Sequence, residues 1–274
     1  MSRVFPATLV LATSVAFLFL LLPVVAIFAR VPPGDLVAAL GSSQAKDALV
    51  VTVETNLIAM ALIAVIGTPT AYLLATRTSR LRDVAVTLVE LPLVLPPAVA
   101  GIGLLAAFGR LGLLGRHFEL GSSIAFTKIA VVLAVAFVAS PFYVRSAIAA
   151  FEGLEPALTA AARTLGSGPG RTFFRVALPL AAGGLSAGAA LASARGIGEF
   201  GATLFFAGSL RGVTQTLPLA IYEAFDVDFR LALAISAELV LVSAGLLLAV
   251  KVINRWRSGS SSPSLFAASP PPSI

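Results

Sequence analysis

The sequence predicts an all-α integral membrane protein with about six transmembrane helices. Hydrophobic residues make up 58% of the 274 residues and charged residues only 12%, which is about half the charge of an ordinary soluble domain. Apolar runs of about 20 residues, the length at which a helix crosses a bilayer, recur along the chain. A chain with so few charged groups could not cover a globular surface in water. This excludes a soluble fold.

The composition also excludes several kinds of site and partner. There is no Cys and only one His, His117, so we expect no disulfide, metal site or cofactor. A net charge of +6 would suggest nucleic acid in a soluble protein. In a membrane chain this charge reflects basic loops on the cytoplasmic side. We therefore expect contact with membrane lipid and no binding of nucleic acid.

The first three expected spans are residues 7–28, 57–76 and 84–108. The first run is uncharged, longer than the apolar part of a signal peptide and not followed by an Ala-x-Ala site, which favours a span over a cleaved leader. Glu54 precedes the second run and Glu90 lies inside the third.

The last three expected spans each contain charged side chains, which are costly at membrane depth and normally face the interior of a bundle. They are 124–144 with Lys128, 180–206 with Arg195 and Glu199, and 231–250 with Glu238. After them, residues 258–274 are rich in Ser, Pro and Ala and are expected to be a disordered tail, leaving 1–257 as the transmembrane domain.

The distribution of Lys and Arg predicts that both termini are cytoplasmic. With this orientation eleven basic residues fall on the cytoplasmic side and seven on the external side. The cytoplasmic set is Arg3, Arg77, Arg80, Arg82, Arg145, Arg163, Arg171, Arg175, Lys251, Arg255 and Arg257. The external set is Arg30, Lys46, Arg110, Arg116, Lys128, Arg211 and Arg230.

A polar cytoplasmic segment, about residues 152–179, predicts a helix–turn–helix. Pro156 suits the first turn of a helix, and the apolar residues that follow recur at helical spacing. Gly166 is placed to end this helix with a left-handed residue. Residues 171–178 predict a second short helix, and Pro179 leads into the fifth span. Apolar side chains left over on this hairpin would bury against a partner.

The same segment superficially suggests a phosphate-binding loop, but its spacing is wrong. The position five residues before Gly170 is Leu165 rather than Gly, and Arg171 stands where the motif has Lys. We therefore expect that this chain does not bind ATP.

The hairpin instead resembles the loop E-A-A-x3-G-x9-I-x-L-P with which permease subunits of ABC importers dock on their ATPase. Val176 replaces the Ile of this pattern, and Ala160 replaces its leading Glu, which removes any ion pair that Glu would make but leaves the helix and turn. The resemblance implies a docking surface made of Ala160, Ala161, Ala162, Leu165, Gly166, Phe173, Phe174, Val176, Leu178 and Pro179.

Two further stretches are similar to molybdate permeases and, less closely, to sulfate permeases. They are ELPLVLPPAVAGIG at 90–103 and RGIGEFGATLFFA at 195–207, and the similarity runs from about residue 7 to 255. It implies the type I ABC importer permease architecture in a cell (inner) membrane, as a non-catalytic subunit. The implied partners are a second copy of the chain, two copies of an ATP-binding ABC subunit and an extracytoplasmic substrate-binding protein. Sulfate and tungstate remain alternative substrates to molybdate.

Side chains within the spans suggest where an anion would pass. Prolines at 92, 96 and 97 kink or break the third span, either for packing or to form part of a path. The gate candidates there are Leu93, Val94, Leu95 and Pro96. Arg195 and Glu199 are four residues apart and can pair, as a structural ion pair or in the path, where a guanidinium suits a tetrahedral oxyanion.

Small residues and acids in these helices have more ordinary roles. Gly184, Gly188 and Ala192 form a stripe that allows close helix packing, within one subunit or between two. Gly196, Gly198 and Gly201 make the helix after Arg195 easy to bend or unwind. We expect Glu90 and Glu238 to be interhelical hydrogen-bond partners.

Two other functional classes fit the sequence less well. A secondary carrier driven by an ion gradient would show repeated halves with paired broken helices, and no such repeat is evident. A polytopic membrane enzyme would need a convergent set of catalytic side chains, which one His, no Cys and scattered acids do not supply.

Overall fold

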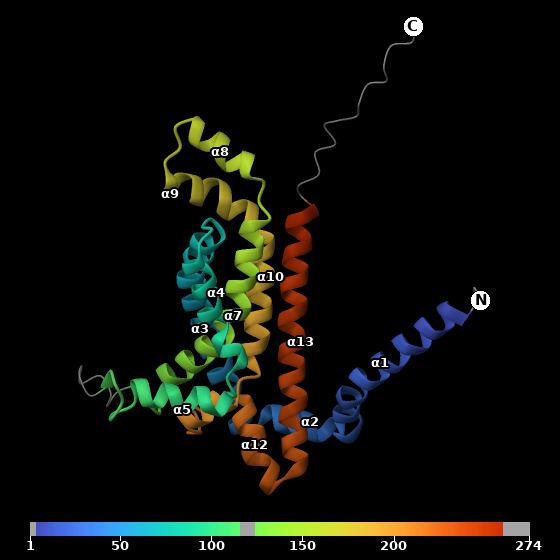
Figure 1. Cartoon of the computed structure of the whole chain (residues 1–274). Helices are drawn as coiled ribbons and strands as arrows, with labels where there is room; N and C mark the ends of the chain where they lie inside the picture. The colour runs from blue at the N-terminus through green and yellow to red at the C-terminus, as the bar shows by residue number, and fades with distance from the viewer. Residues whose placement is uncertain (1–3, 116–123, 260–274) are drawn as a thin grey trace.

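The structure, a computed structural model, describes residues 4–115 and 124–259, and in these ranges every regular element is a helix (Figure 1). His117 and nearly all of the expected tail lie outside the described residues. Five helices are long and apolar enough to cross a membrane, and a bent pair makes a sixth if it is counted as one span, which confirms the expected number. The five are α1 (Val4–Arg30), α3 (Ser43–Ala75), α7 (Lys128–Glu152), α10 (Leu178–Ile197) and α13 (Phe229–Gly259).

The bent pair is α4 (Arg80–Val94) and α5 (Pro97–Phe108), between which the chain bends by 113°. Leu95 and Pro96 between them are extended. The prolines therefore break this span as predicted, because Pro96 and Pro97 have no N–H to donate to the preceding turn. Pro92, in contrast, lies inside α4 without ending it.

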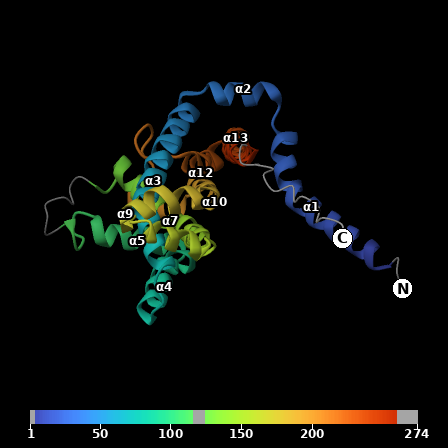
Figure 2. The same cartoon turned by 90° about the horizontal axis from the view of Figure 1, so that it is seen from above.

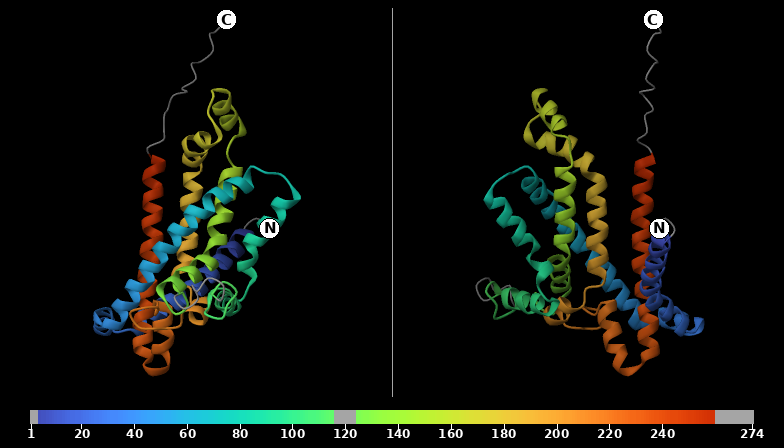
Figure 3. Two further views of the ribbon diagram at one scale, coloured as in Figure 1. Left: turned by 90° about the vertical axis from the view of Figure 1, so that its left-hand side faces the viewer. Right: turned by 45° about the vertical axis from the view of Figure 1, so that its right-hand side comes forward.

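Shorter helices that the sequence pattern did not predict join the long ones. They are α2 (Pro33–Gly41), α11 (Gly201–Ala207) and α12 (Leu217–Val227). The views in Figure 3 place α2 and α12 at one end of the molecule. The helical hairpin and the C-terminal end of α13 lie at the other end.

α7 lies at the centre of the bundle and packs against α3 and α10 over small residues. Gly67 of α3 lies against Tyr143 and Val144, where an added Cβ would be 3.1 Å from each side chain. Gly184 and Gly188 of α10 lie against Ala150 and Ser146 of α7. The predicted small-residue stripe therefore packs two helices within one subunit.

Helix α7 differs from its predicted span at both ends. It begins at Lys128 rather than 124 and continues to Glu152, so Arg145 lies within the helix and not in a cytoplasmic loop as expected. The reason is that Ala147, Ile148 and Phe151 continue the buried apolar face beyond the charge. α3 likewise begins at Ser43, well before the expected 57, because Ser42 caps it by accepting from the Ala45 N–H at 3.2 Å.

Helix α1 lies at the edge of the molecule and is largely uncovered. It packs against α13, and none of its apolar stretch is buried. Figure 2 shows it running away from the other helices. Such an apolar helix belongs in lipid or against another subunit.

Candidate functional site

The first helix of the hairpin is α8 (Pro156–Thr164). It ends at a left-handed glycine, as predicted. Gly166 has a φ of 81°, in the left-handed region. The Gly166 N–H donates to the Arg163 carbonyl at 3.0 Å and the Ser167 N–H to the Ala162 carbonyl at 3.0 Å. These bonds satisfy carbonyls at the end of α8, which is the usual role of a left-handed glycine.

The second half of the hairpin is not the separate short helix that we expected. α9 (Pro169–Thr172) continues through a π-helical turn, η2 (Phe173–Ala177), directly into α10. Within this turn the Leu178 N–H donates to the Phe173 carbonyl, five residues back. Pro179 has no N–H, and its ring would crowd the carbonyl four residues back. The wider π turn lets the chain pass Pro179 without breaking.

The predicted docking residues divide into an exposed and an inward-facing set. Leu165 is 87% exposed and Phe174 66% exposed, whereas Phe173 packs on Tyr72 with ring centroids 4.8 Å apart. The exposed members are Ala160, Ala161, Leu165, Gly166, Phe174 and Pro179, and the half-buried members are Ala162, Phe173, Val176 and Leu178. The first set is accessible to a partner, and Phe173 and Leu178 of the second set pack against the buried cluster of the bundle.

Glu199 and Arg195 pair as the sequence predicted, but not on one continuous helix. α10 ends at Ile197, and Glu199 lies in the break before α11. Arg195 Nη2 is 2.7 Å from Glu199 Oε2, and the Ala202 N–H donates to Oε1 at 2.8 Å. Both carboxylate oxygens of this buried side chain are therefore satisfied, so Glu199 holds the start of α11 against the end of α10.

The two breaks in the bundle lie side by side. An added Cβ at Gly201, at the start of α11, would be 2.7 Å from the Cβ of Pro97, at the start of α5. Gly101 of α5 lies equally close to the backbone of Ala202. The structure thus brings the predicted gate, 93–96, next to the segment that carries Glu199. Val94, at the bend between α4 and α5, is 81% exposed.

The sequence pattern missed several polar side chains that join helices. Asn56 donates to Ser193 Oγ at 2.6 Å, and its Oδ1 is buried without a partner among the described residues. Arg145 pairs with Glu90, with 3.2 Å between Nε and Oε1. Glu90 therefore has the interhelical partner that we expected, whereas Arg145 as that partner and the role of Asn56 were missed, because both depend on contacts between distant helices. Glu238 is buried, and its Oε2 has no partner in the described part of the chain, contrary to the expected hydrogen bond.

Two more ion pairs join helices nearer their ends. Arg82 pairs with Glu152 and also donates to the Leu74 carbonyl at 3.1 Å, which ties the α3–α4 turn to the base of the hairpin. Lys128 pairs with Glu54 at 2.6 Å. Within residues 4–115 and 124–259 there is no group of three His, Cys, Asp or Glu side chains that could hold a metal ion.

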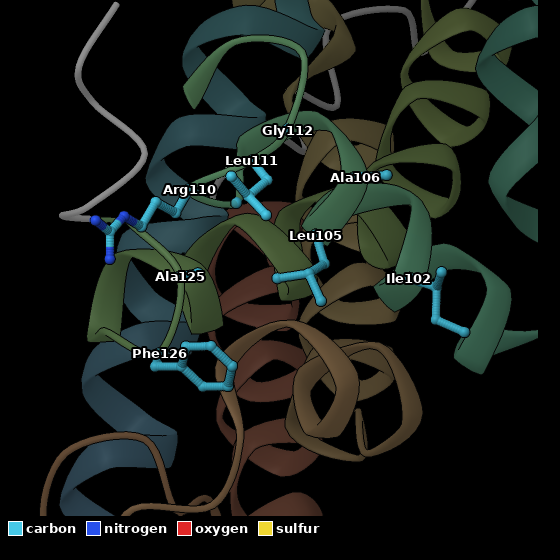
Figure 4. Close-up of a pocket in the computed structure, with 9 residues that line it drawn as sticks. Ile102, Leu105, Ala106, Arg110, Leu111, Gly112, Ala125 and Phe126 are labelled. Atoms are coloured by element: carbon cyan, nitrogen blue, oxygen red, sulfur yellow. The ribbon is translucent and has the colours of Figure 1, made fainter. Parts of the chain in front are cut away.

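A cavity of about 670 Å³ lies beside α5, away from the predicted site residues. Figure 4 shows Leu105 and Ile102 of α5 and the ring of Phe126 around it, with the Arg110 guanidinium extending away from these apolar side chains. Because its lining is mostly apolar, this cavity offers no cluster of polar groups that would bind an anion.

Comparisons with known proteins agree with the geometry. The family model described as the binding-protein-dependent transport system inner membrane component matches residues 64–258. The molybdenum transport system permease protein ModB of Mycobacterium tuberculosis is 44% identical over 246 residues, 89% of this chain and 93% of the relative. A probable molybdenum ABC transporter permease protein of Haloferax volcanii is 38% identical over 259 residues, 91% of each chain.

Solved structures share the fold at low sequence identity. A bacterial alginate ABC transporter in complex with an alginate-bound periplasmic protein has a TM-score of 0.72 at 15% identity, covering 93% of this chain and 95% of that one. The MetNI methionine ABC transporter in an inward-facing conformation has a TM-score of 0.60 at 21% identity, covering 78% and 94%. This likeness extends to the fold alone.

Proposed function

Because this chain belongs to the family of binding-protein-dependent transport system inner membrane components, we propose that it forms the transmembrane path of an ATP-driven importer for molybdate. The family makes it a multi-pass inner membrane permease subunit, which works with a separate ATPase and a substrate-binding protein. The observation that carries the choice of substrate is the 44% identity to a molybdenum permease over 89% of this chain. Sulfate and tungstate, which have the same charge and shape, are the competing substrates.

The proposed assembly is a homodimer with two ATPase copies beneath the hairpins. The exposed set of docking residues, with Leu165 and Phe174 most prominent, is the surface that an ATPase would cover. The hairpin lies at the same end as the C-terminal end of α13 (Figure 3), which supports a cytoplasmic C-terminus. An even number of crossings would place the N-terminus on that side as well.

The path would pass between the two copies, past the corner formed by residues 93–96 and the Arg195–Glu199 pair. The Arg195 guanidinium is the group suited to a tetrahedral oxyanion. Glu199 positions it and repels the same anion. A net-neutral pair would hold the anion weakly, as a path must if it is to release what it binds.

Reconstitution tests this proposal. The chain, its ATPase and its binding protein are placed in liposomes with ATP inside, and uptake of radioactive molybdate is measured with unlabelled sulfate or tungstate as competitors. We expect ATP-dependent uptake that sulfate inhibits only at large excess. Uptake without the ATPase would instead indicate a secondary carrier, and equal competition by sulfate would overturn the choice of molybdate.

A further inference from the structure

Arg145 lies inside the expected membrane-spanning helix α7, on the side of that helix that α3 leaves open. It lies seven residues before Glu152, the last residue of α7, which places it about 10 Å from that end of a helix about 37 Å long. Its side chain is nevertheless 60% exposed. A charge exposed to hydrocarbon at this depth is costly, so this side of α7 faces water or a second subunit rather than lipid tails.

Helix geometry places Arg145 and Arg195 on the side of the α7–α10 pair away from α3, because Arg145 is two residues from Tyr143 and Arg195 is next to Gly196. α3 covers the opposite side, where Gly67 lies against Tyr143 and Asn56 lies against Gly196. The open side of α10 includes Leu191, which is four residues before Arg195 and therefore on the same helix face. On α7, Ala149 is exposed and is likewise four residues from Arg145.

The two arginines are at different depths. Gly188 of α10 packs on Ser146 of α7, so Arg145 is level with the residues next to Gly188. Arg195 is seven residues further along α10, about 10 Å nearer the external end. The open side thus carries one arginine about midway and another closer to the cytoplasm.

The Arg145–Glu90 pair leaves donors available. The ion pair runs through Nε, and Nη1 and Nη2 donate no hydrogen bond to any described residue. These two nitrogens are the kind of planar donor pair that binds an oxyanion by two hydrogen bonds. The Glu90 carboxylate, itself 35% exposed, repels an anion and keeps it from binding tightly.

We propose that Arg145, balanced by Glu90, is a second binding station for a tetrahedral oxyanion between Arg195 and the cytoplasm. This inference rests on the proposed function as an oxyanion importer. An anion leaving Arg195 would meet Arg145 at a level about 10 Å nearer the cytoplasm, and Glu90 would favour its release. Two weak stations permit passage where one strong site would retain the anion.

The test separates a binding role from a merely structural ion pair. Removing Arg145 alone would leave Glu90 unpaired, so the informative variant is the double substitution Arg145→Gln with Glu90→Gln, which removes both charges and keeps the side-chain size. Each variant is reconstituted with its ATPase and binding protein, and molybdate uptake and ATP hydrolysis are measured together. We expect the maximal uptake rate per ATP to fall about tenfold, the factor associated with losing one charge-assisted hydrogen bond.

Lys128→Gln with Glu54→Gln is the matched control, because it also removes an ion pair between α7 and a neighbouring helix. We expect its uptake to stay within about twofold of wild type, since an exposed pair contributes little. Wild-type uptake by the Arg145/Glu90 double variant would contradict a binding role for Arg145. An equal loss of uptake in the Lys128/Glu54 control variant would contradict it too. If the wild-type transporter moves no oxyanion at all, the proposed function fails instead.

Discussion

Gly183 and Gly188 lie on the same helix, α10, and have opposite surroundings. An added Cβ at Gly188 would be 2.7 Å from the Ser146 Cβ and 3.2 Å from the Tyr143 carbonyl, whereas nothing lies within 4 Å of an added Cβ at Gly183. The same substitution should therefore have opposite effects at the two positions.

We expect Gly188→Ala to destabilise the folded subunit by about 1–3 kcal/mol, because α7 and α10 must move apart. Gly183→Ala should stabilise it by about 0.5–1 kcal/mol, because Ala loses less backbone entropy in a helix. The unfolding midpoint of each purified variant in detergent measures both effects. A lower midpoint for Gly183→Ala than for Gly188→Ala would show that the α7–α10 contact is not tight.

Single residues also show how far the sequence could predict the site. The Arg195–Glu199 pair was predictable because residues four apart are neighbours on a helix, and the pair forms although α10 ends at Ile197 between them. The pairing of Arg145 with Glu90, and of Asn56 with Ser193, was not. Both depend on which helices pack together and at what level, and one apolar run looks like another in sequence.

At the scale of elements, the hairpin was predicted better than the span that follows it. Its first helix and the turn at Gly166 follow from local capping rules. The π-helical turn before Pro179 could not be anticipated, because the usual effect of a proline is to end a helix. The glycines predicted a segment that bends or unwinds easily, but the expected span 180–206 ran through the break after Ile197, and the separate helix α11 was not expected.

Gly166→Val tests the hairpin. Val tolerates the left-handed φ of 81° poorly, at a cost of roughly 1–2 kcal/mol, so the end of α8 should rearrange. We expect several-fold lower co-purification with the ATPase and lower substrate-stimulated ATP hydrolysis.

Gly168→Val is the matched control, because Gly168 has a φ of −66° and open space around its Cβ position. An extended conformation also suits a residue that precedes a proline. Its ATPase binding should stay close to wild type. Normal coupling by Gly166→Val, or an equal loss in both variants, would contradict the docking role of this turn.

At the scale of the whole molecule, the described residues leave apolar and charged surfaces uncovered. α4 has no buried residue, α1 is uncovered over its apolar stretch, and two arginines lie on an open side of the bundle. The number of spans could be predicted from length and hydropathy. The splayed position of α1 and the sharp bend between α4 and α5 could not, because they depend on contacts outside the local sequence.

Disulfide cross-linking tests the proposed dimer, and the chain has no Cys of its own to interfere. Val94→Cys places one thiol at the gate corner, where two symmetric copies would face each other across the path. We expect an oxidant to double the apparent mass of this variant in membranes. Val65→Cys on α3, which is 73% exposed on the other side of the bundle, should stay monomeric. The reverse pattern would place the subunit interface on α3.

The uninterrupted helix from the hairpin into the bundle has a mechanical consequence. Residues Pro169–Ile197 form one apolar helical stretch of 29 residues, about 43 Å long, with Phe174 near one end and Arg195 near the other. If a docked ATPase tilted this helix by about 10° as a rigid rod, the far end would move by roughly 7 Å over that length, and Gly198 lies just beyond that end.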